Sequence, residues 1–134
     1  MNTSRLMIAA AVLALTGATA HSADKPTRAE KSEARLAEML KGRTAGEPVS
    51  CIPEFQSNRL EVIEGVAMVY GTGKTIYVAK PDRLEPSQWD DIMVVKRMGS
   101  QLCNTDIIRT VDRMGGFTTG VVFMSKFVPY TKKD

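Results

Sequence analysis

The sequence predicts a mainly β protein, a small antiparallel barrel or sandwich of about six strands, preceded by one N-terminal helix. Two observations lead to this fold class. From residue 49 onward, short runs rich in β-branched and aromatic residues alternate with Gly- and Pro-containing turns. Before residue 49, the segment 21–48 is instead rich in Ala, Glu, Lys, Arg and Leu, a composition typical of a helix.

The N-terminal residues have the order of a secretory signal peptide. Arg5 gives a positive start, residues 6–18 are mostly apolar, and small residues lead up to Ala20. We expect cleavage between Ala20 and His21 and a periplasmic or secreted mature protein. The apolar run is shorter than the roughly 20 residues that span a bilayer, and no later segment approaches that length. No transmembrane segment is therefore expected after removal of the signal peptide, residues 1–20.

The segment 21–48 is expected to be a polar helix followed by a linker. Thr27 and Glu30 have the spacing of a capping box, and Gly42 stands where a helix would end. The helix of residues 27–41 has a narrow apolar stripe, formed by Leu36, Met39 and Leu40. A helix of this length is marginal by itself in water. The stripe therefore either packs on the chain's own β domain or a partner, or the segment frays.

The β domain is expected to span residues 49–130, with residues 131–134 as a tail. Its clearest feature is a hairpin around the loop Gly-Thr-Gly-Lys at 71–74. The run 106–111 also fits a helical stripe, but its Ile, Thr and Val content favours a strand. The expected strands are residues 59–64, 66–70, 75–79, 91–97, 106–111 and 121–127.

The two cysteines, Cys51 and Cys103, are predicted to form an intramolecular disulfide. An oxidising compartment and one pair of cysteines are sufficient for it. A catalytic thiol needs a base, and the only histidine, His21, lies outside the β domain. Two cysteines and one histidine also fall short of a structural zinc set. An intermolecular bridge and two free thiols remain the alternatives.

Composition excludes several partners and cofactors. The sequence has 18 basic and 15 acidic residues, and loss of Arg5 with the signal peptide leaves 17 against 15, a formal +2. Without a basic stripe, nucleic acid is not an expected partner. The Gly-Thr-Gly-Lys loop lacks the first glycine of a phosphate loop, where Met68 stands, and Ile76 breaks a dinucleotide fingerprint. We expect no cofactor.

No catalytic residues are predicted. The serines lack a histidine for a triad, and no Gly-x-Ser-x-Gly motif occurs. Asp90 and Asp91 are neighbours that would point to opposite faces of a strand, and Asp106 and Asp112 would lie too far apart for paired catalysis. Turn-forming or salt-bridged roles are expected for all four. An enzyme of unfamiliar type using Asp106, Asp112 or Lys74 is a minor alternative.

A second alternative is a periplasmic copper-binding protein. His21 would become the mature N-terminus, where an amine and an imidazole can chelate copper, and thioethers can bind Cu(I). Methionine more often fills gaps in a core, so no metal ligand is assigned. The candidate thioethers, with Trp89 as a nearby fluorophore, are those of Met68, Met93, Met98, Met114 and Met124.

Three stretches resemble a family of small exported proteobacterial proteins of unknown function. They contain Cys51-Ile52, Leu102-Cys103 with Asp106, and Phe127-Val128-Pro129. The likeness covers about residues 49–130 and implies export and the same fold class, but no catalytic role. We therefore expect a non-enzymatic exported β module that binds an unknown protein or acts as an envelope component.

Overall fold

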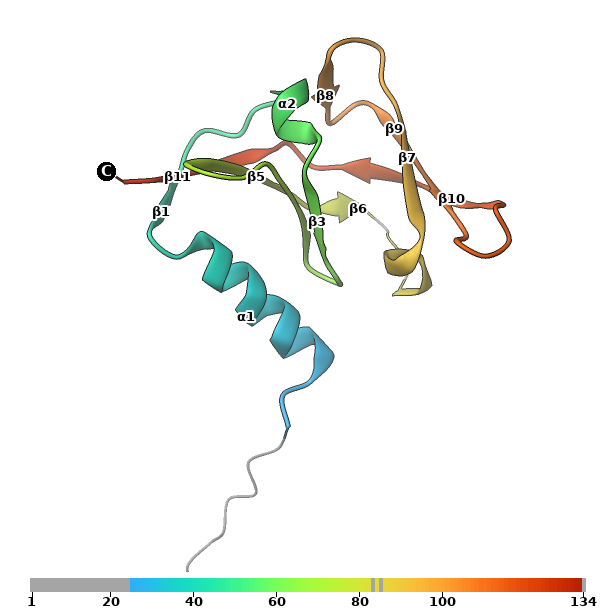
Figure 1. The fold of residues 1–134 in the computed structure, drawn as a ribbon, viewed down its shortest axis with the longest axis horizontal. Coiled ribbons are helices and arrows are strands. Elements are labelled where there is room, and N and C mark those ends of the chain that lie inside the picture. The colour runs from blue at the N-terminus through green and yellow to red at the C-terminus, as the bar shows by residue number, and fades with distance from the viewer. Residues whose placement is uncertain (1–24, 83, 85, 134) are drawn as a thin grey trace, which may run out of the picture.

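The computed structural model describes residues 25–82, 84 and 86–133, and it confirms the mainly β fold class (Figure 1). The elements are, in chain order, α1 (Arg28–Leu40), β1 (Arg43–Ala45), β2 (Cys51–Pro53), α2 (Glu54–Ser57), β3 (Leu60–Ile63), β4 (Ala67–Tyr70), β5 (Thr75–Ala79), β6 (Pro81–Asp82), η1 (Pro86–Asp90), β7 (Ile92–Lys96), β8 (Gln101–Cys103), β9 (Ile107–Val111), β10 (Thr118–Met124) and β11 (Val128–Lys132). The six expected strands correspond to β3, β4, β5, β7, β9 and β10, so the ambiguous run at 106–111 is indeed a strand. Because β11 extends to Lys132, it includes part of the segment expected to be a tail.

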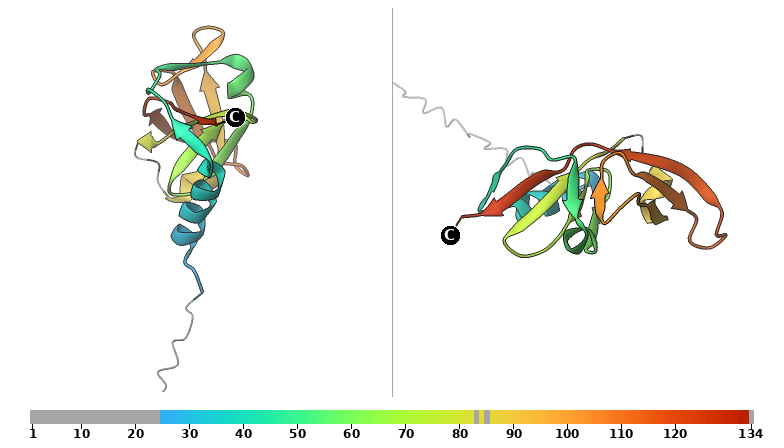
Figure 2. Two further views of the ribbon diagram at one scale, coloured as in Figure 1. Left: turned by 90° about the vertical axis from the view of Figure 1, so that its left-hand side faces the viewer. Right: turned by 90° about the horizontal axis from the view of Figure 1, so that it is seen from above.

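The strands form antiparallel sheets with a sandwich-like arrangement, and no closed barrel. A five-stranded sheet has the order β1-β11-β5-β4-β3, a four-stranded sheet has the order β6-β10-β9-β7, and β2 pairs with β8. Only Lys80 separates β5 from β6, and residues 125–127 separate β10 from β11. On one side of this bend β5 pairs with β11, and on the other side β6 pairs with β10. The two larger sheets are therefore joined through one bent pair of chain segments (Figure 2).

The main core lies between the sheets and the β2–β8 ribbon. Phe127, Ile52 and Val122 have no exposed surface there, and the ring of Tyr70 meets that of Phe127 edge-on, with centroids 5.7 Å apart. The buried members of this cluster are Ile52, Met68, Tyr70, Ala79, Leu102, Ile108, Val122, Met124 and Phe127. It gathers residues from both sheets and the ribbon, which explains why these short strands can form a stable unit.

Helix α1 packs on the opposite face of the five-stranded sheet. Leu36, Met39 and Leu40 lie against a second buried cluster, which consists of Ile63, Ala67, Val69, Ile76 and Val78. Strand β4 is buried along its whole length because the helix covers one face and the main core covers the other. The predicted capping box is present, since the Thr27 side chain accepts from the Glu30 amide while the Glu30 carboxylate accepts from the Thr27 amide. Docking on its own domain, one of the outcomes left open by the sequence, is therefore the one observed.

Candidate functional site

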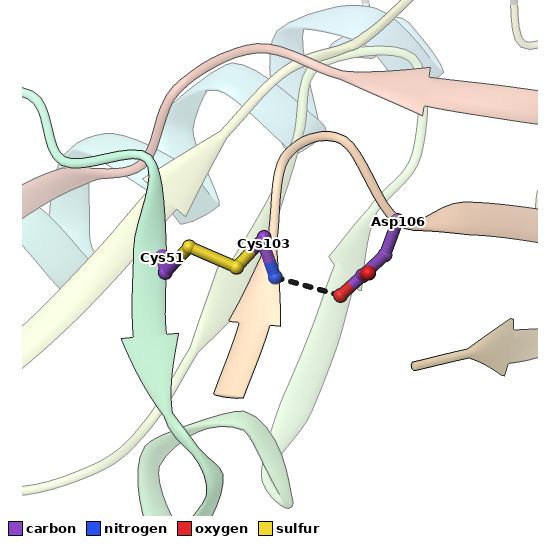
Figure 3. The surroundings of a disulfide bond; sticks show 3 residues. All are labelled: Cys51, Cys103 and Asp106. Atoms are coloured by element: carbon purple, nitrogen blue, oxygen red, sulfur yellow. Dashed lines mark hydrogen bonds between the residues drawn. A yellow bond between two sulfur atoms is a disulfide. The ribbon is translucent and has the colours of Figure 1, made fainter. Parts of the chain in front are cut away.

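The two cysteines lie directly opposite each other on the β2–β8 ribbon (Figure 3). Their sulfurs are 2.00 Å apart and their Cα atoms 3.9 Å apart, so the predicted intramolecular disulfide is present. The next register pair, Ile52 and Leu102, is fully buried in the main core. The bond therefore ties the ribbon together at the point where it joins the core, and neither sulfur is a thiol.

Asp106 closes the turn between β8 and β9. Its carboxylate accepts a hydrogen bond from the Cys103 amide at 2.8 Å, and its own amide donates to the Cys103 carbonyl at 3.0 Å (Figure 3). The residue is only 5% exposed. Both contacts hold the chain beside the disulfide, which is the turn-forming role that the sequence predicted.

Asp112 has the same kind of role at the other end of β9. Its carboxylate accepts from the amides of Met114 and Gly115, and its amide donates to the Phe117 carbonyl, which closes the β9–β10 hairpin. Since Asp106 and Asp112 flank β9 at opposite ends, the fold does not bring them together as a carboxylate pair. Each of them stabilises a separate turn.

Asp90 and Asp91 lie in a different setting from the one predicted. They are the end of η1 and the residue after it, before β7 begins, and not adjacent positions of a strand. The Asp90 carbonyl accepts from the Arg113 guanidinium, and the Asp91 carboxylate accepts from the Thr119 hydroxyl. The predicted strand began at Asp91, one residue before β7 does.

Sequence reasoning missed a polar network beside Asp91. Thr110 of β9 is fully buried, and its hydroxyl lies 2.8 Å from that of Thr119 and 3.3 Å from the Gln88 amide nitrogen. The Thr119 hydroxyl lies within hydrogen-bond distance of both the Asp91 carboxylate and the Thr110 hydroxyl, and the Thr110 hydroxyl accepts from the Gln88 amide. The chain of bonds fixes η1 on the sheet. Its only sequence signal was a threonine at an inward position of a β-branched strand.

The methionines considered for copper are not gathered at one place. The Met68 and Met124 sulfurs approach the hydroxyl of Tyr70 at 3.8 and 3.9 Å inside the main core. Burial there raises the pKa of Tyr70 well above its usual value. Met93 packs at the edge of this core, whereas Met98 and Met114 are exposed in separate loops.

The remaining parts of the copper alternative cannot be placed. Ala20 and His21, the expected cleavage site, lie outside the described residues. Within residues 25–82, 84 and 86–133, no group of three or more His, Cys, Asp or Glu side chains could hold a metal ion.

The Gly-Thr-Gly-Lys segment is the loop of the β4–β5 hairpin, as predicted. Gly71 and Gly73 have φ of +84° and +87°, which explains the glycines, because other residues rarely adopt this conformation. The carbonyls of Gly73 and Lys74 accept from Arg43 at 2.8 and 2.6 Å. The loop is thereby tied to the segment that follows α1.

Beside this loop lies a groove of about 420 Å³. Its walls come from the end of α1, the start of β3 and the hairpin loop, which are far apart in the sequence. The lining residues are Met39, Arg43, Arg59, Leu60, Glu61, Gly71, Thr72, Gly73 and Ile76. Its volume falls within the range of small-molecule sites, and the groove is partly open to solvent.

The charged residues of the groove differ in what already binds them. The Arg43 guanidinium donates to backbone carbonyls, including that of Met39 at 3.0 Å, and so acts as a structural clamp. Glu61 pairs with Arg35 of α1 at 2.9 Å. Arg59 is exposed, and no hydrogen bond or ion pair of its side chain occurs within the described part of the chain. Arg59 is therefore the groove's available cation.

Comparison of the chain with protein-family models, with curated proteins and with solved structures found no match. Among the residues that the structure describes, no helix has the length and apolar character needed to cross a membrane.

Proposed function

We propose that the chain is a non-enzymatic exported binding module, and that the groove between α1, β3 and the β4–β5 loop takes a small amphipathic anion. The observation that carries this proposal is the pairing of apolar walls with one available cation. Met39, Leu60 and Ile76 supply the apolar surface, and Arg59 supplies the charge. A ligand with a carboxylate or phosphate and a short apolar chain matches both features.

Two further observations support export without catalysis. The disulfide between Cys51 and Cys103 is the kind of bond that persists in an oxidising compartment such as the periplasm. The same bond consumes both thiols, while the carboxylates of Asp106 and Asp112 are engaged in turns. The copper alternative has less support, because the exposed and the buried methionines lie in different parts of the fold.

The proposal is tested by calorimetric titration with octanoate, octanol and inorganic phosphate. We expect saturable binding of octanoate, and binding of octanol that is about tenfold weaker because it lacks the charge. Arg59→Gln should lower the affinity for octanoate to that for octanol, and it should leave the affinity for octanol unchanged. Arg113→Gln, on the far β9–β10 hairpin, is the matched control and should bind like the wild type. Absence of saturable octanoate binding, or equal affinity in Arg59→Gln, would refute the groove as an anion site.

The export part has its own measurement. The periplasmic fraction of a Gram-negative host that expresses the full sequence should contain a chain beginning at His21, identified by mass spectrometry of the intact protein. A chain recovered only from the cytosol with both sulfurs reduced would contradict this part of the proposal and leave the groove to be judged by the titration.

A further inference from the structure

The four-stranded sheet has an outer face on which apolar side chains are exposed. Along β7, β9 and β10, burial alternates, so every second side chain points away from the core. We define the outer face by its apolar residues, which are 45–55% exposed: Ile92, Val94, Ile107, Val121 and Phe123. Such half-exposed side chains together present on the order of 400 Å² of apolar surface, the size at which a patch often marks an interaction site.

Two cations, Arg109 and Lys96, lie among these apolar side chains. The strand register places Arg109 between Val94 on β7 and Val121 on β10. It places Lys96, the last residue of β7, opposite Ile107 on β9. Both cationic residues are exposed, and neither side chain has a hydrogen bond or an ion pair within the described part of the chain. The outer face therefore combines apolar surface with available positive charge.

The described carboxylates nearest to this face lie at its margins. Asp82 lies opposite Phe123 on the edge strand β6, and it already has an interaction partner. Asp90, Asp91 and Asp112 lie at the end of the sheet where the β9–β10 hairpin turns, before the first residue of β7 and after the last residue of β9. The middle of the face and the other end of β7 carry the cations, so the charge that a partner meets there is positive.

We propose that the outer face docks on an anionic phospholipid surface. Its apolar side chains then lie at the boundary between headgroups and acyl chains, and Arg109 and Lys96 bind lipid phosphates. Long cationic side chains suit this setting, because their aliphatic stems stay in apolar surroundings while the charged ends reach the polar layer. Strand β9, in the middle of the face, is paired on both sides, so its backbone brings no unsatisfied hydrogen-bonding group to the lipid.

The position of Arg109 favours lipid over a protein partner. A protein surface would need a carboxylate at one fixed place opposite Arg109, between Val94 and Val121, because a guanidinium buried there without a partner is costly. A second copy of this chain would offer another arginine at the centre of the same face. The phosphates of a fluid leaflet are mobile and cover the whole surface, so each cation finds a partner without a matched geometry.

The charge of the face determines how selective this binding should be. A lysine or arginine near an anionic surface strengthens binding about fivefold, so two of them give a preference on the order of 20-fold for anionic over neutral vesicles. Salt screens this contribution, whereas the contribution of the apolar side chains remains at high salt. The groove beside Arg59 is formed by α1, β3 and the β4–β5 loop, so vesicle binding and ligand binding are separate properties.

Co-sedimentation of the oxidised mature protein with lipid vesicles tests the proposal. The vesicles consist of phosphatidylcholine alone, or of phosphatidylcholine with about one-third phosphatidylglycerol. We expect the wild type to bind the anionic vesicles on the order of 20-fold more tightly than the neutral ones. Arg109→Gln and Lys96→Gln should each weaken binding to the anionic vesicles about fivefold, and Val121→Asn should remove the binding that remains at high salt. Lys31→Gln, on α1 at the far side of the five-stranded sheet, is the matched control and should bind like the wild type.

Circular dichroism and urea unfolding of each variant keep a folding defect apart from a binding defect. A wild type that binds neither kind of vesicle, or both equally, overturns the proposal, and so does undiminished binding in Arg109→Gln and Lys96→Gln. Undiminished binding of Val121→Asn at high salt overturns it too, because the apolar side chains would then contribute nothing. A wild type that ignores vesicles but forms a dimer, which Val121→Asn abolishes, would assign the outer face to a second copy instead. Arg59→Gln should bind vesicles normally and Arg109→Gln should bind octanoate normally, so failure here leaves the groove proposal untouched.

Discussion

Removal of the Cys51–Cys103 bond should cost about 4 kcal/mol of unfolding free energy. The two cysteines are 52 positions apart, so the bond closes a long loop in the unfolded chain. By the loop-entropy relation, a loop of this length restricts the unfolded ensemble by about 14 cal/mol/K, which is about 4 kcal/mol at 25 °C. That is a large share of the 5–15 kcal/mol typical of whole domains.

The native structure gives a second reason to expect a strong effect. The β2–β8 ribbon has only three register pairs, and Ile52 and Leu102 are its buried anchors in the main core. Without the bond, a ribbon this short depends on those two side chains and on the turn that Asp106 closes. Loss of the disulfide should therefore loosen this end of the core before the five-stranded sheet unfolds.

The assay is urea unfolding of the oxidised wild type and of the Cys51→Ala/Cys103→Ala variant, followed by Trp89 fluorescence and by far-UV circular dichroism. At a typical urea dependence, 4 kcal/mol corresponds to a fall in midpoint of about 2–3 M. Reductant should reproduce the fall in the wild type and have no effect on the variant. Midpoints that agree within about 0.3 M would refute the reasoning, because the bond would then leave the unfolded chain unrestricted.

Three further predictions concern other parts of the fold. Asp106→Ala should destabilise by about 1–3 kcal/mol in urea unfolding, because the Cys103 amide loses its partner, and Asp106→Asn should lose less; equal losses would contradict the hydrogen-bond explanation. Leu36→Ala should lower the free energy of unfolding by about 1–2 kcal/mol, which is less than the loss expected for a fully buried leucine, because Leu36 is only partly buried. It should also increase the rate of hydrogen exchange in α1 more than in β4. Thr27→Ala should cost about 1 kcal/mol by removing the cap. The hydrogen bonds from Thr27 lower the pKa of Glu30 below its usual value of 4.5. The stabilisation of the helix by these bonds is therefore complete above pH 4.5 and is lost as the pH falls through the lowered pKa. In Thr27→Ala, helix content should fall less over this acid range than in the wild type.

Much of the local structure could be predicted because its signals lie within a few residues of each other. The capping box depends on a three-residue spacing, and the β4–β5 hairpin on two β-branched runs around a glycine loop. The misplaced start of β7 at Asp91 has a physical cause too. The Asp91 amide donates to the Gln88 carbonyl in the last turn of η1, so β7 begins one residue later, at Ile92.

The short strands show more clearly which parts of the fold the sequence could not predict. With three or two residues each, β1, β2, β6 and β8 are too brief to show an alternating pattern, and they exist because a partner strand lies beside them. The groove has the same origin, since Met39, Arg59 and Thr72 come from three separate elements. Nothing in the spacing of these residues could have indicated that they share one wall.

The sequence by itself determined the β-rich class, the capped helix and the hairpin, because each of them depends on a local pattern. It also determined the disulfide, because the chain has only two cysteines and therefore only one possible intramolecular pairing. Tertiary structure alone decided the bend that joins the two sheets, the docking of α1 and the groove beside Arg59. These features depend on which distant strands pair and in which register, and that is settled by the burial of side chains from the whole chain at once.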